Sequence, residues 1–251
     1  MAINNGKGAI GLDKEDTLYQ HGTLALLVPG LLTGTLTIGE LLEHGDYGIG
    51  TLQGLDGELT LVDGVGYLAQ SDGNVVTVDP KETVPFANAH FQRATDKLEH
   101  TQITKAALEK EIMQNHDYEN IFFAMKIHGV FSSVRTRVVA GNRQPPFKPL
   151  AIVAQNQELF SAENVTGTLV GYYSPELFQG VASAGFHVHF VSDDHQFGGH
   201  ILDYALTQGT VELQRFENLD LHLPVHDSTY RKHRFDYDDM SAVIRSAEGN
   251  E

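Results

Sequence analysis

Three Asp-Gly pairs in the first third of the chain constrain its fold most strongly. They are Asp56-Gly57, Asp63-Gly64 and Asp72-Gly73, and each lies between runs of alternating apolar residues. Glycine tolerates the positive φ angles of tight turns, so this pattern indicates antiparallel strands joined by short hairpins. We therefore predict hairpin-connected strands at about 49–53, 58–62, 65–70 and 74–78.

The rest of the chain adds further strands and two helical segments. A helix is predicted at about 102–115, because Ile103, Leu108 and Ile112 fall on one helical face. A short helix is predicted after Thr37, since Thr37 and Glu40 have the spacing of a capping box. Further strands are predicted at about 121–128, 131–139, 165–173, 186–192, 201–206 and 210–215. The predicted fold class is α+β: strand-rich, with mixed β-sheets and a few helices.

Two segments of the chain resemble each other and suggest a duplication. Thr33-Gly34-Thr35-Leu36 recurs as Thr166-Gly167-Thr168-Leu169, and on this alignment Glu58 and His200 take equivalent places. We expect two similar halves, 1–140 and 141–251, that meet near the proline-rich connector 144–149. The first, β-rich half contains Glu58 and Arg137, and the second contains a histidine motif and the C-terminal tail.

The composition excludes several classes of protein. The formal net charge is −16, which argues against nucleic-acid binding because a polyanion needs a basic surface. The sequence has no apolar run long enough to span a bilayer, and residues 1–15 lack the basic and apolar regions of a signal peptide. We therefore expect a cytoplasmic protein with no membrane partner. The chain has no cysteine, so any metal must be bound through nitrogen or oxygen.

A histidine motif is the strongest chemical signal in the sequence. In Phe186-His187-Val188-His189-Phe190 the two histidines are two residues apart, so on a strand their side chains project from one face. His200 follows Gly198-Gly199, where the backbone can approach closely and bring a third imidazole to the pair. Three imidazoles with an open position are a recurrent catalytic zinc arrangement, and copper, iron and nickel also accept imidazole. The alternative is that these histidines serve only in the core or on the surface.

Charged residues elsewhere could complete such a site. A metal centre that handles protons needs a nearby carboxylate, and the spacing does not choose among the candidates. These are Glu58, Asp63, Asp193, Asp194 and Glu248. His195 is a competing ligand, although the adjacent glycines favour His200. Arg135 and Arg137 alternate on one predicted strand, and either could bind a substrate carboxylate unless both are solvated on an outer face.

These motifs resemble those of the alpha-acetolactate decarboxylase family. The resemblance rests on 185–194 (GFHVHFVSDD) with 198–203 (GGHILD), on 54–59 (GLDGEL), and on Thr136-Arg137 with the following Gln144-Pro145-Pro146. It extends from about residue 18 to the C-terminus. The family implies a zinc enzyme that converts (S)-2-acetolactate to (R)-acetoin and carbon dioxide on the butanediol route, and a homodimer.

The resemblance also implies roles for individual residues. His187, His189 and His200 match the zinc ligands, and Arg137 matches the active-site arginine. Glu58 matches a carboxylate implicated in proton transfer, with Thr51 close to it. Zinc would chelate the hydroxyl and ketone oxygens of the substrate, and a glutamate would protonate the resulting enediolate. A tail glutamate also reaches the zinc in this family, and Glu248 fits that role best, with Glu251 as a rival.

Two other classes of protein compete with this interpretation. A cupin-like dioxygenase or isomerase also carries His-x-His on a strand, but it usually has a glutamate a few residues later, where this chain has Ser192-Asp193-Asp194. A metal-binding module without activity would close its site with a fourth protein ligand.

Overall fold

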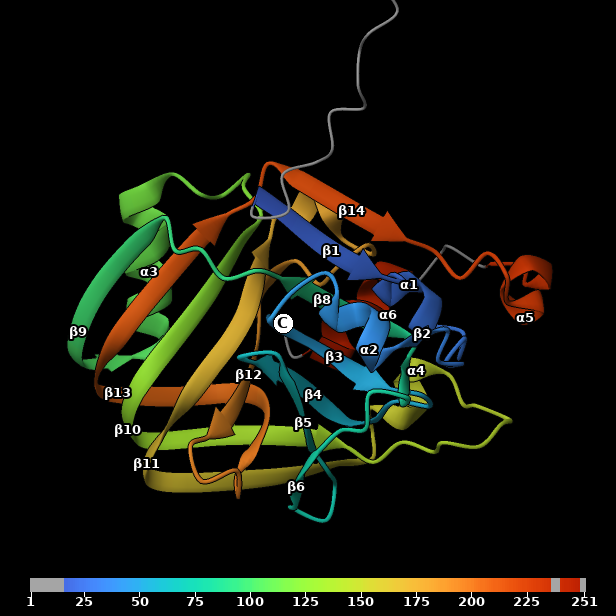
Figure 1. The fold of residues 1–251 in the computed structure, drawn as a ribbon, viewed down its shortest axis with the longest axis horizontal. Helices are drawn as coiled ribbons and strands as arrows, with labels where there is room; N and C mark the ends of the chain where they lie inside the picture. The colour runs from blue at the N-terminus through green and yellow to red at the C-terminus, as the bar shows by residue number, and fades with distance from the viewer. Residues whose placement is uncertain (1–15, 236–239, 249–251) are drawn as a thin grey trace, which may run out of the picture.

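Most of the N-terminal strands belong to one sheet. The computed structural model describes residues 16–235 and 240–248. The strands of the first sheet are β1 (Thr17–His21), β3 (Tyr47–Leu52), β4 (Asp56–Val62), β5 (Val65–Ala69), β6 (Val75–Thr77), β8 (Phe86–His90) and β14 (Asn218–His222). Their spatial order is β14-β1-β8-β3-β4-β5-β6 (Figure 1). Only the β1–β14 pairing in this sheet is parallel, so the sheet is mixed.

The second sheet contains longer strands. They are β9 (Asp96–Thr104), β10 (Phe123–Val139), β11 (Gln157–Ser174), β12 (Gly185–Ser192) and β13 (Gly198–Arg215). The order is β10-β11-β12-β13-β9, all antiparallel. β10 also pairs with β13, so the strands from β10 to β13 close into a ring. A further pair joins β2 (Leu36–Thr37) to β7 (Thr83–Val84).

A row of glycines crosses the three long strands β10, β11 and β13, which bend sharply in Figure 1. Gly129 on β10 faces Gly167 on β11 and Gly209 on β13; we call these three residues the glycine row. A Cβ atom on Gly129 would lie 2.3 Å from the carbonyl oxygen of Gln208, so the strands approach too closely for a side chain there. Register shifts between Val130 and Ser133 mark bulges beside the row, and bulges bend strands.

Short helices border the sheets. They are α1 (Leu24–Leu27), α2 (Ile38–Leu42), α3 (Lys105–His116), α4 (Leu150–Val153), the 3-10 turn η2 (Glu176–Phe178), α5 (Ser228–Lys232) and α6 (Met240–Glu248). The capping box predicted for α2 is confirmed, since the backbone N–H groups of Glu40 and Thr37 each donate to the side chain of the other. None of the helices in the described ranges combines the length and apolar character of a membrane span.

The strand-rich α+β fold with mixed sheets is confirmed. Asp63-Gly64 and Asp72-Gly73 lie in turns as predicted, whereas Asp56-Gly57 begins β4 and the turn before it is at 53–55. Asp63 and Gly64, between β4 and β5, have φ of +50° and +75°, as a tight two-residue hairpin requires. The helix predicted at 102–115 begins later, because the residues before Lys105 complete β9 by pairing with β13. The strands predicted at 121–128 and 131–139 form one strand, β10, since pairing continues through the glycine row.

The boundary predicted at residue 140 does not separate the two sheets. β9 and β10 precede it and belong to the second sheet, whereas β14 follows it and joins the first. The duplication into two similar halves stays a prediction.

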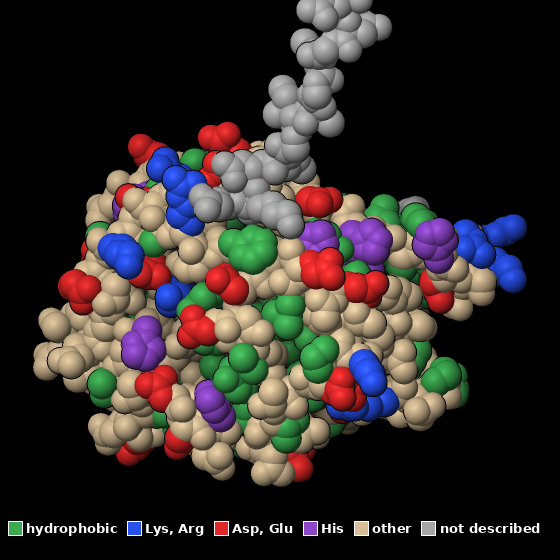
Figure 2. Space-filling model, viewed as in Figure 1, with side chains coloured by type: hydrophobic (Ala, Val, Ile, Leu, Met, Phe, Trp, Pro, Cys, Tyr) green, Lys and Arg blue, Asp and Glu red, His purple; other side chains and the backbone are tan. Residues whose placement is uncertain are grey.

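On the face shown in Figure 2, the Lys and Arg side chains lie in small separate groups among Asp and Glu side chains. This distribution agrees with the net charge of −16, and the visible face has no broad basic surface among its described residues.

Candidate active site

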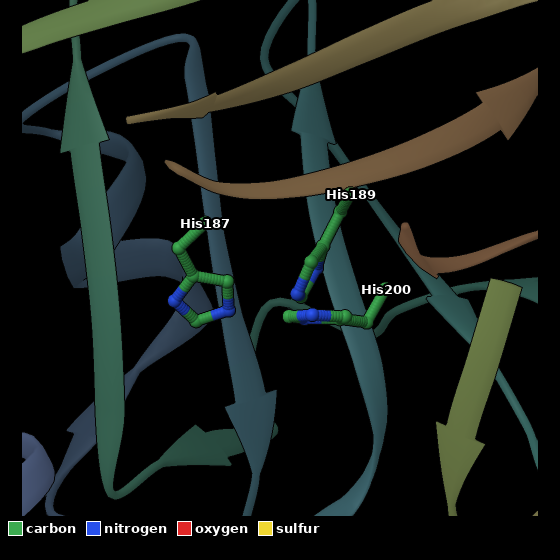
Figure 3. Close-up of side chains that lie close together, drawn as sticks. All are labelled: His187, His189 and His200. Carbon is green, nitrogen blue, oxygen red and sulfur yellow. The ribbon is translucent and has the colours of Figure 1, made fainter. Parts of the chain in front are cut away.

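The three predicted histidines lie together where β12 meets β13. His187 and His189 project from one face of β12, and His200 on β13 is the register partner of His189. Their rings turn toward one another (Figure 3), and one nitrogen of each lies within 4.8 Å of the others. Within the described ranges, this is the group of side chains whose geometry could hold a metal ion.

The glycines before His200 allow this convergence. Gly199 has a φ of +131°, and a Cβ atom there would lie 2.8 Å from the carbonyl oxygen of Arg137. A Cβ atom on Gly198 would lie 2.8 Å from the carbonyl oxygen of Phe190. A side chain at either position would therefore separate β13 from its neighbours and move His200 away from the pair.

The tautomer of His189 is set by a backbone group of the first sheet. Nδ1 of His189 is 2.8 Å from the carbonyl oxygen of Leu59 on β4. A carbonyl can only accept, so Nδ1 carries a hydrogen. In the neutral ring the lone pair then lies on Nε2, the nitrogen that faces Glu58. This is the arrangement that a histidine ligand of a metal usually has.

Burial keeps the other two imidazoles neutral. It lowers the pKa of His187 to about 3, with a further contribution from the nearby positive charge of Arg137. It also holds the pKa of His200 well below the usual range, again assisted by Arg137. Neutral imidazole is the form that binds metals, so the donor set of His187, His189 and His200 fits Zn²⁺ with a position left for water or substrate.

Glu58 lies between the histidines and an arginine. From β4 its two carboxylate oxygens reach 3.4 Å from Nη1 of Arg137 and 3.5 Å from Nε2 of His189. Glu58 and Arg137 are only 7% and 5% exposed, so their mutual attraction is little screened by water. Arg137 on β10 is also the register partner of His200 on β13. Side chains from β4, β10, β12 and β13 therefore meet at this site.

Thr51 on β3 supports the turn that leads to Glu58. Its hydroxyl is buried and donates a hydrogen bond of 2.8 Å to the carbonyl oxygen of Gly57. Thr51 lines the same pocket as Glu58, Arg137, His187 and His189. The structure therefore brings all the described candidate residues from the family resemblance to one place.

The remaining wall of this pocket is apolar. It comes mainly from three short helices that are far apart in the sequence, α1, α4 and α6, and from neighbouring strands. The apolar lining residues are Leu24, Leu27, Leu55, Phe86, Val139, Leu150, Ala154 and Ala247. An apolar wall excludes water and strengthens electrostatic interactions inside the pocket.

The other acidic candidates lie elsewhere. Asp63 accepts a hydrogen bond from the hydroxyl of Tyr47. Asp193 is 3.4 Å from His128, and Asp194 accepts hydrogen bonds within its own turn. None of these three aspartates lines the pocket around Glu58.

His195 and Arg135 also lie outside this pocket. His195 stacks on Tyr67 at a ring separation of 4.3 Å, on a loop where its φ is +54°. Arg135 is exposed, whereas Arg137 is buried at the end of β10 nearest to β4. An isolated bridge between Asp56 and Ala140 brings these two strands together near Arg137.

The tail glutamates are only partly described. Glu248 is the last residue of α6, and its side chain lies outside the described residues, as does the whole of Glu251. The preceding Ala247 lines the pocket, and Ile244 is fully buried against α1 and α4. The C-terminal helix therefore reaches the pocket, as the resemblance implies for the tail.

Sequence reasoning missed the apolar wall and the carbonyl of Leu59. The apolar run Leu24–Leu27 is visible in the sequence, but its contact with α6 depends on tertiary packing. No local pattern identifies which backbone carbonyl meets His189.

Comparisons with known proteins agree with this geometry. The family model for alpha-acetolactate decarboxylase matches residues 18–237. The alpha-acetolactate decarboxylase of Streptococcus thermophilus is 41% identical over 92% of this chain and 98% of that protein. The crystal structure of the Bacillus subtilis strain 168 enzyme superposes with a TM-score of 0.88 at 33% identity, and covers 92% of this chain and 99% of that one. A Staphylococcus aureus structure, described as similar to alpha-acetolactate decarboxylase, gives a TM-score of 0.89 at 40% identity over 92% of this chain and all of that one.

Because the family model matches most of the sequence, and relatives of similar length share a third or more of its residues, this chain belongs to the alpha-acetolactate decarboxylase family.

Proposed function

We propose that this protein is a zinc-dependent decarboxylase that converts (S)-2-acetolactate to (R)-acetoin and carbon dioxide. The observation that supports this most is the meeting of three imidazoles with the Glu58–Arg137 pair in one apolar pocket. Family membership supplies the substrate and the reaction.

The reaction needs a place for an electron pair and a source for a proton. When the bond between the carboxylate and C2 breaks, its electron pair moves into the adjacent ketone and gives an enediolate. C2 then takes up one proton, which the site regains from water after each turnover. A divalent metal held by His187, His189 and His200 supplies Lewis-acid stabilisation of the negative charge on substrate oxygens.

Two charged residues of the chain would act on the substrate. Arg137 presents a guanidinium at the pocket and can bind the carboxylate or an oxygen through a bidentate pair. Glu58 lies beside the histidine cluster, where a protonated carboxyl can deliver a proton to one face of C2. Delivery from one side fixes the handedness of the product.

The first experiment is acetoin formation from racemic acetolactate by the purified protein, before and after metal removal with a chelator. We expect activity to disappear and to return when zinc is added. His187→Ala should abolish both zinc binding and activity, whereas His195→Ala, outside the pocket, serves as the matched control. A folded, zinc-loaded protein that forms no acetoin would contradict the proposed function.

We also propose that Glu248 completes the site from α6. Its neighbour Ala247 lines the pocket, which supports this choice over Glu251. Glu248→Gln should lower kcat by about 10-fold or more, the usual effect of losing a group that moves a proton. Glu251→Gln is the control, and an effect confined to Glu251→Gln would reverse the assignment.

The competing classes are less well supported. A cupin-like enzyme disagrees with the family match, and a closed metal module would need a fourth protein ligand, whereas the group found among the described residues has three. From the family resemblance we further propose a homodimer and acetolactate as the small-molecule partner, and from the sequence pattern we propose a cytoplasmic location. Sedimentation equilibrium tests the dimer.

A further inference from the structure

The turn before Glu58 has an unusual backbone. Gly54, Leu55 and Gly57, which connect β3 to Glu58, have φ of +79°, +57° and +84°. Positive φ costs glycine little, but a leucine in this region is strained and persists only where its surroundings hold it. Leu55 is also buried and lines the pocket, so the strained turn directly shapes the candidate site.

The segment 140–143, which follows the strand of Arg137, contacts this turn along its length. Asp56 and Ala140 form a β-bridge. The backbone N–H of Asn142 donates a hydrogen bond of 3.1 Å to the carbonyl oxygen of Gly54. The end of β10 and the start of β4 are therefore joined by main-chain contacts.

The backbones of the turn and of the segment 140–143 pack too closely for one to shift along the other. A Cβ atom on Gly54 would lie 1.9 Å from the carbonyl oxygen of Asn142, and one on Gly141 would lie 2.1 Å from that of Leu55. Backbones this close transmit a displacement of one segment directly to the other.

Arg143 ties the two segments together with its side chain. Its Nε donates to the carboxylate of Asp56, and its Nη1 lies 2.9 Å from Glu82. Its own carbonyl accepts a hydrogen bond of 2.8 Å from the side-chain amide of Gln53. Arg143 thereby contacts the turn on both sides of Leu55, and its partner Asp56 is two residues before Glu58.

We propose that Arg143 is a positioning residue that, through Asp56, sets the Glu58 carboxylate relative to Arg137 and the histidines. This inference rests on the proposed function, because it concerns the geometry of proton delivery. Arg143 does not line the pocket itself, so its influence on the reaction passes through the turn.

The positioning role predicts an effect on turnover that exceeds the effect on stability. The side chains of Arg143 and Asp56 are 39% and 28% exposed, and such ion pairs add little to unfolding stability because water screens them. Proton transfer, in contrast, is sensitive to small displacements of the carboxyl. Loosening the turn should lower kcat and let protons reach both faces of C2.

The test compares Arg143→Met, Asp56→Asn, their double variant, Arg143→Lys and Glu82→Gln with the zinc-loaded wild type. We expect kcat of Arg143→Met and Asp56→Asn to fall about 10-fold or more, with KM changed less than about twofold. The double variant should be no slower than the single ones, and the acetoin formed should lose enantiomeric purity. Arg143→Lys keeps one charge near Asp56 and should recover part of kcat.

Glu82→Gln is the matched control, because Glu82 pairs with Arg143 but lies outside the turn. If Glu82→Gln reduced kcat as much as Arg143→Met, or if Arg143→Met left kcat and enantiomeric purity unchanged, the positioning role would be wrong. If Arg143→Met failed to fold, Arg143→Lys and Asp56→Asn would decide by the same measurements. A wild type that forms no acetoin would instead contradict the proposed function.

Discussion

Glu58 is the residue on which the proposed chemistry depends most directly. Its carboxylate contacts both Arg137 and His189, yet it is not one of the three converging donors. Glu58→Gln should therefore retain zinc while kcat falls by about 10²-fold, since an amide cannot deliver a proton. Metal content and kcat are measured on the same sample, with exposed Glu163→Gln as control. Unchanged turnover would remove Glu58 from the mechanism.

His90 makes the fold sensitive to acid. It is buried between Tyr172, 2.9 Å from Nδ1, and Gln92, 2.8 Å from Nε2, and burial lowers its pKa from 6.5 to about 4. The unfolded chain takes up a proton on this imidazole below pH 6.5, whereas the folded chain resists until about pH 4. The contribution of His90 to the unfolding free energy therefore falls by about 3 kcal/mol as the pH drops from 6.5 to about 4. Above pH 6.5 this contribution is constant.

This dependence is measured by denaturant unfolding between pH 4 and pH 7. His90→Gln should give a shallower decline than the wild type, because the glutamine side chain does not titrate. His128→Gln, at an exposed position, controls for the loss of a histidine. Equal slopes for His90→Gln and the wild type would show that His90 does not carry the effect.

Among the elements, the bent strands depend on the glycine row. Gly129→Ala would place a methyl group 2.3 Å from the carbonyl oxygen of Gln208, so β10 and β13 must separate. We expect a loss of about 1–3 kcal/mol in unfolding free energy, typical of overpacking. Gly66→Ala on β5 is the control, since its Cβ would make ordinary contacts at 3.5 Å. Equal stability of the two variants would contradict this account.

The same row explains where sequence patterns failed for the elements. Gly129 and Gly209 interrupt the apolar alternation, so one strand was predicted as two in each case. Alternation reports local exposure, and it cannot show that pairing continues across a glycine. The turns at Asp63-Gly64 and Asp72-Gly73 were predicted correctly because their signal is local: each needs only a residue that accepts positive φ. Asp56-Gly57 carries the same local signal but lies in β4, because its strand pairing begins earlier than the pattern indicates.

In the candidate site, too, local patterns were predicted from the sequence and long-range contacts were not. The spacing of His187 and His189 was sufficient to predict a shared face, because a strand has a fixed period of two. Glu58 and Arg137 could be selected from other charged residues only through the family resemblance, since their meeting depends on how β4 crosses β10. The apolar wall from α1, α4 and α6 depends on packing between distant segments.

For the whole molecule, metal binding should stabilise the fold, because the three histidines converge only when β12 and β13 are paired. Free zinc at 100 times its Kd should add about 2.7 kcal/mol to the unfolding free energy. For a chain of 251 residues this corresponds to a rise in Tm of about 5–10 °C. Differential scanning calorimetry with His187→Ala as control measures it, and an unchanged Tm of the wild type would contradict binding at this site.

The parallel pairing of β1 with β14 sets when the protein can finish folding during translation. His21 and His222 lie side by side at the ends of these strands, although they are 201 residues apart. At ordinary rates of synthesis, β1 waits about 10–40 s on the ribosome before β14 is made. Throughout that interval the outer edge of β1 is open to pairing with other nascent chains, and the emergence of β14 closes it.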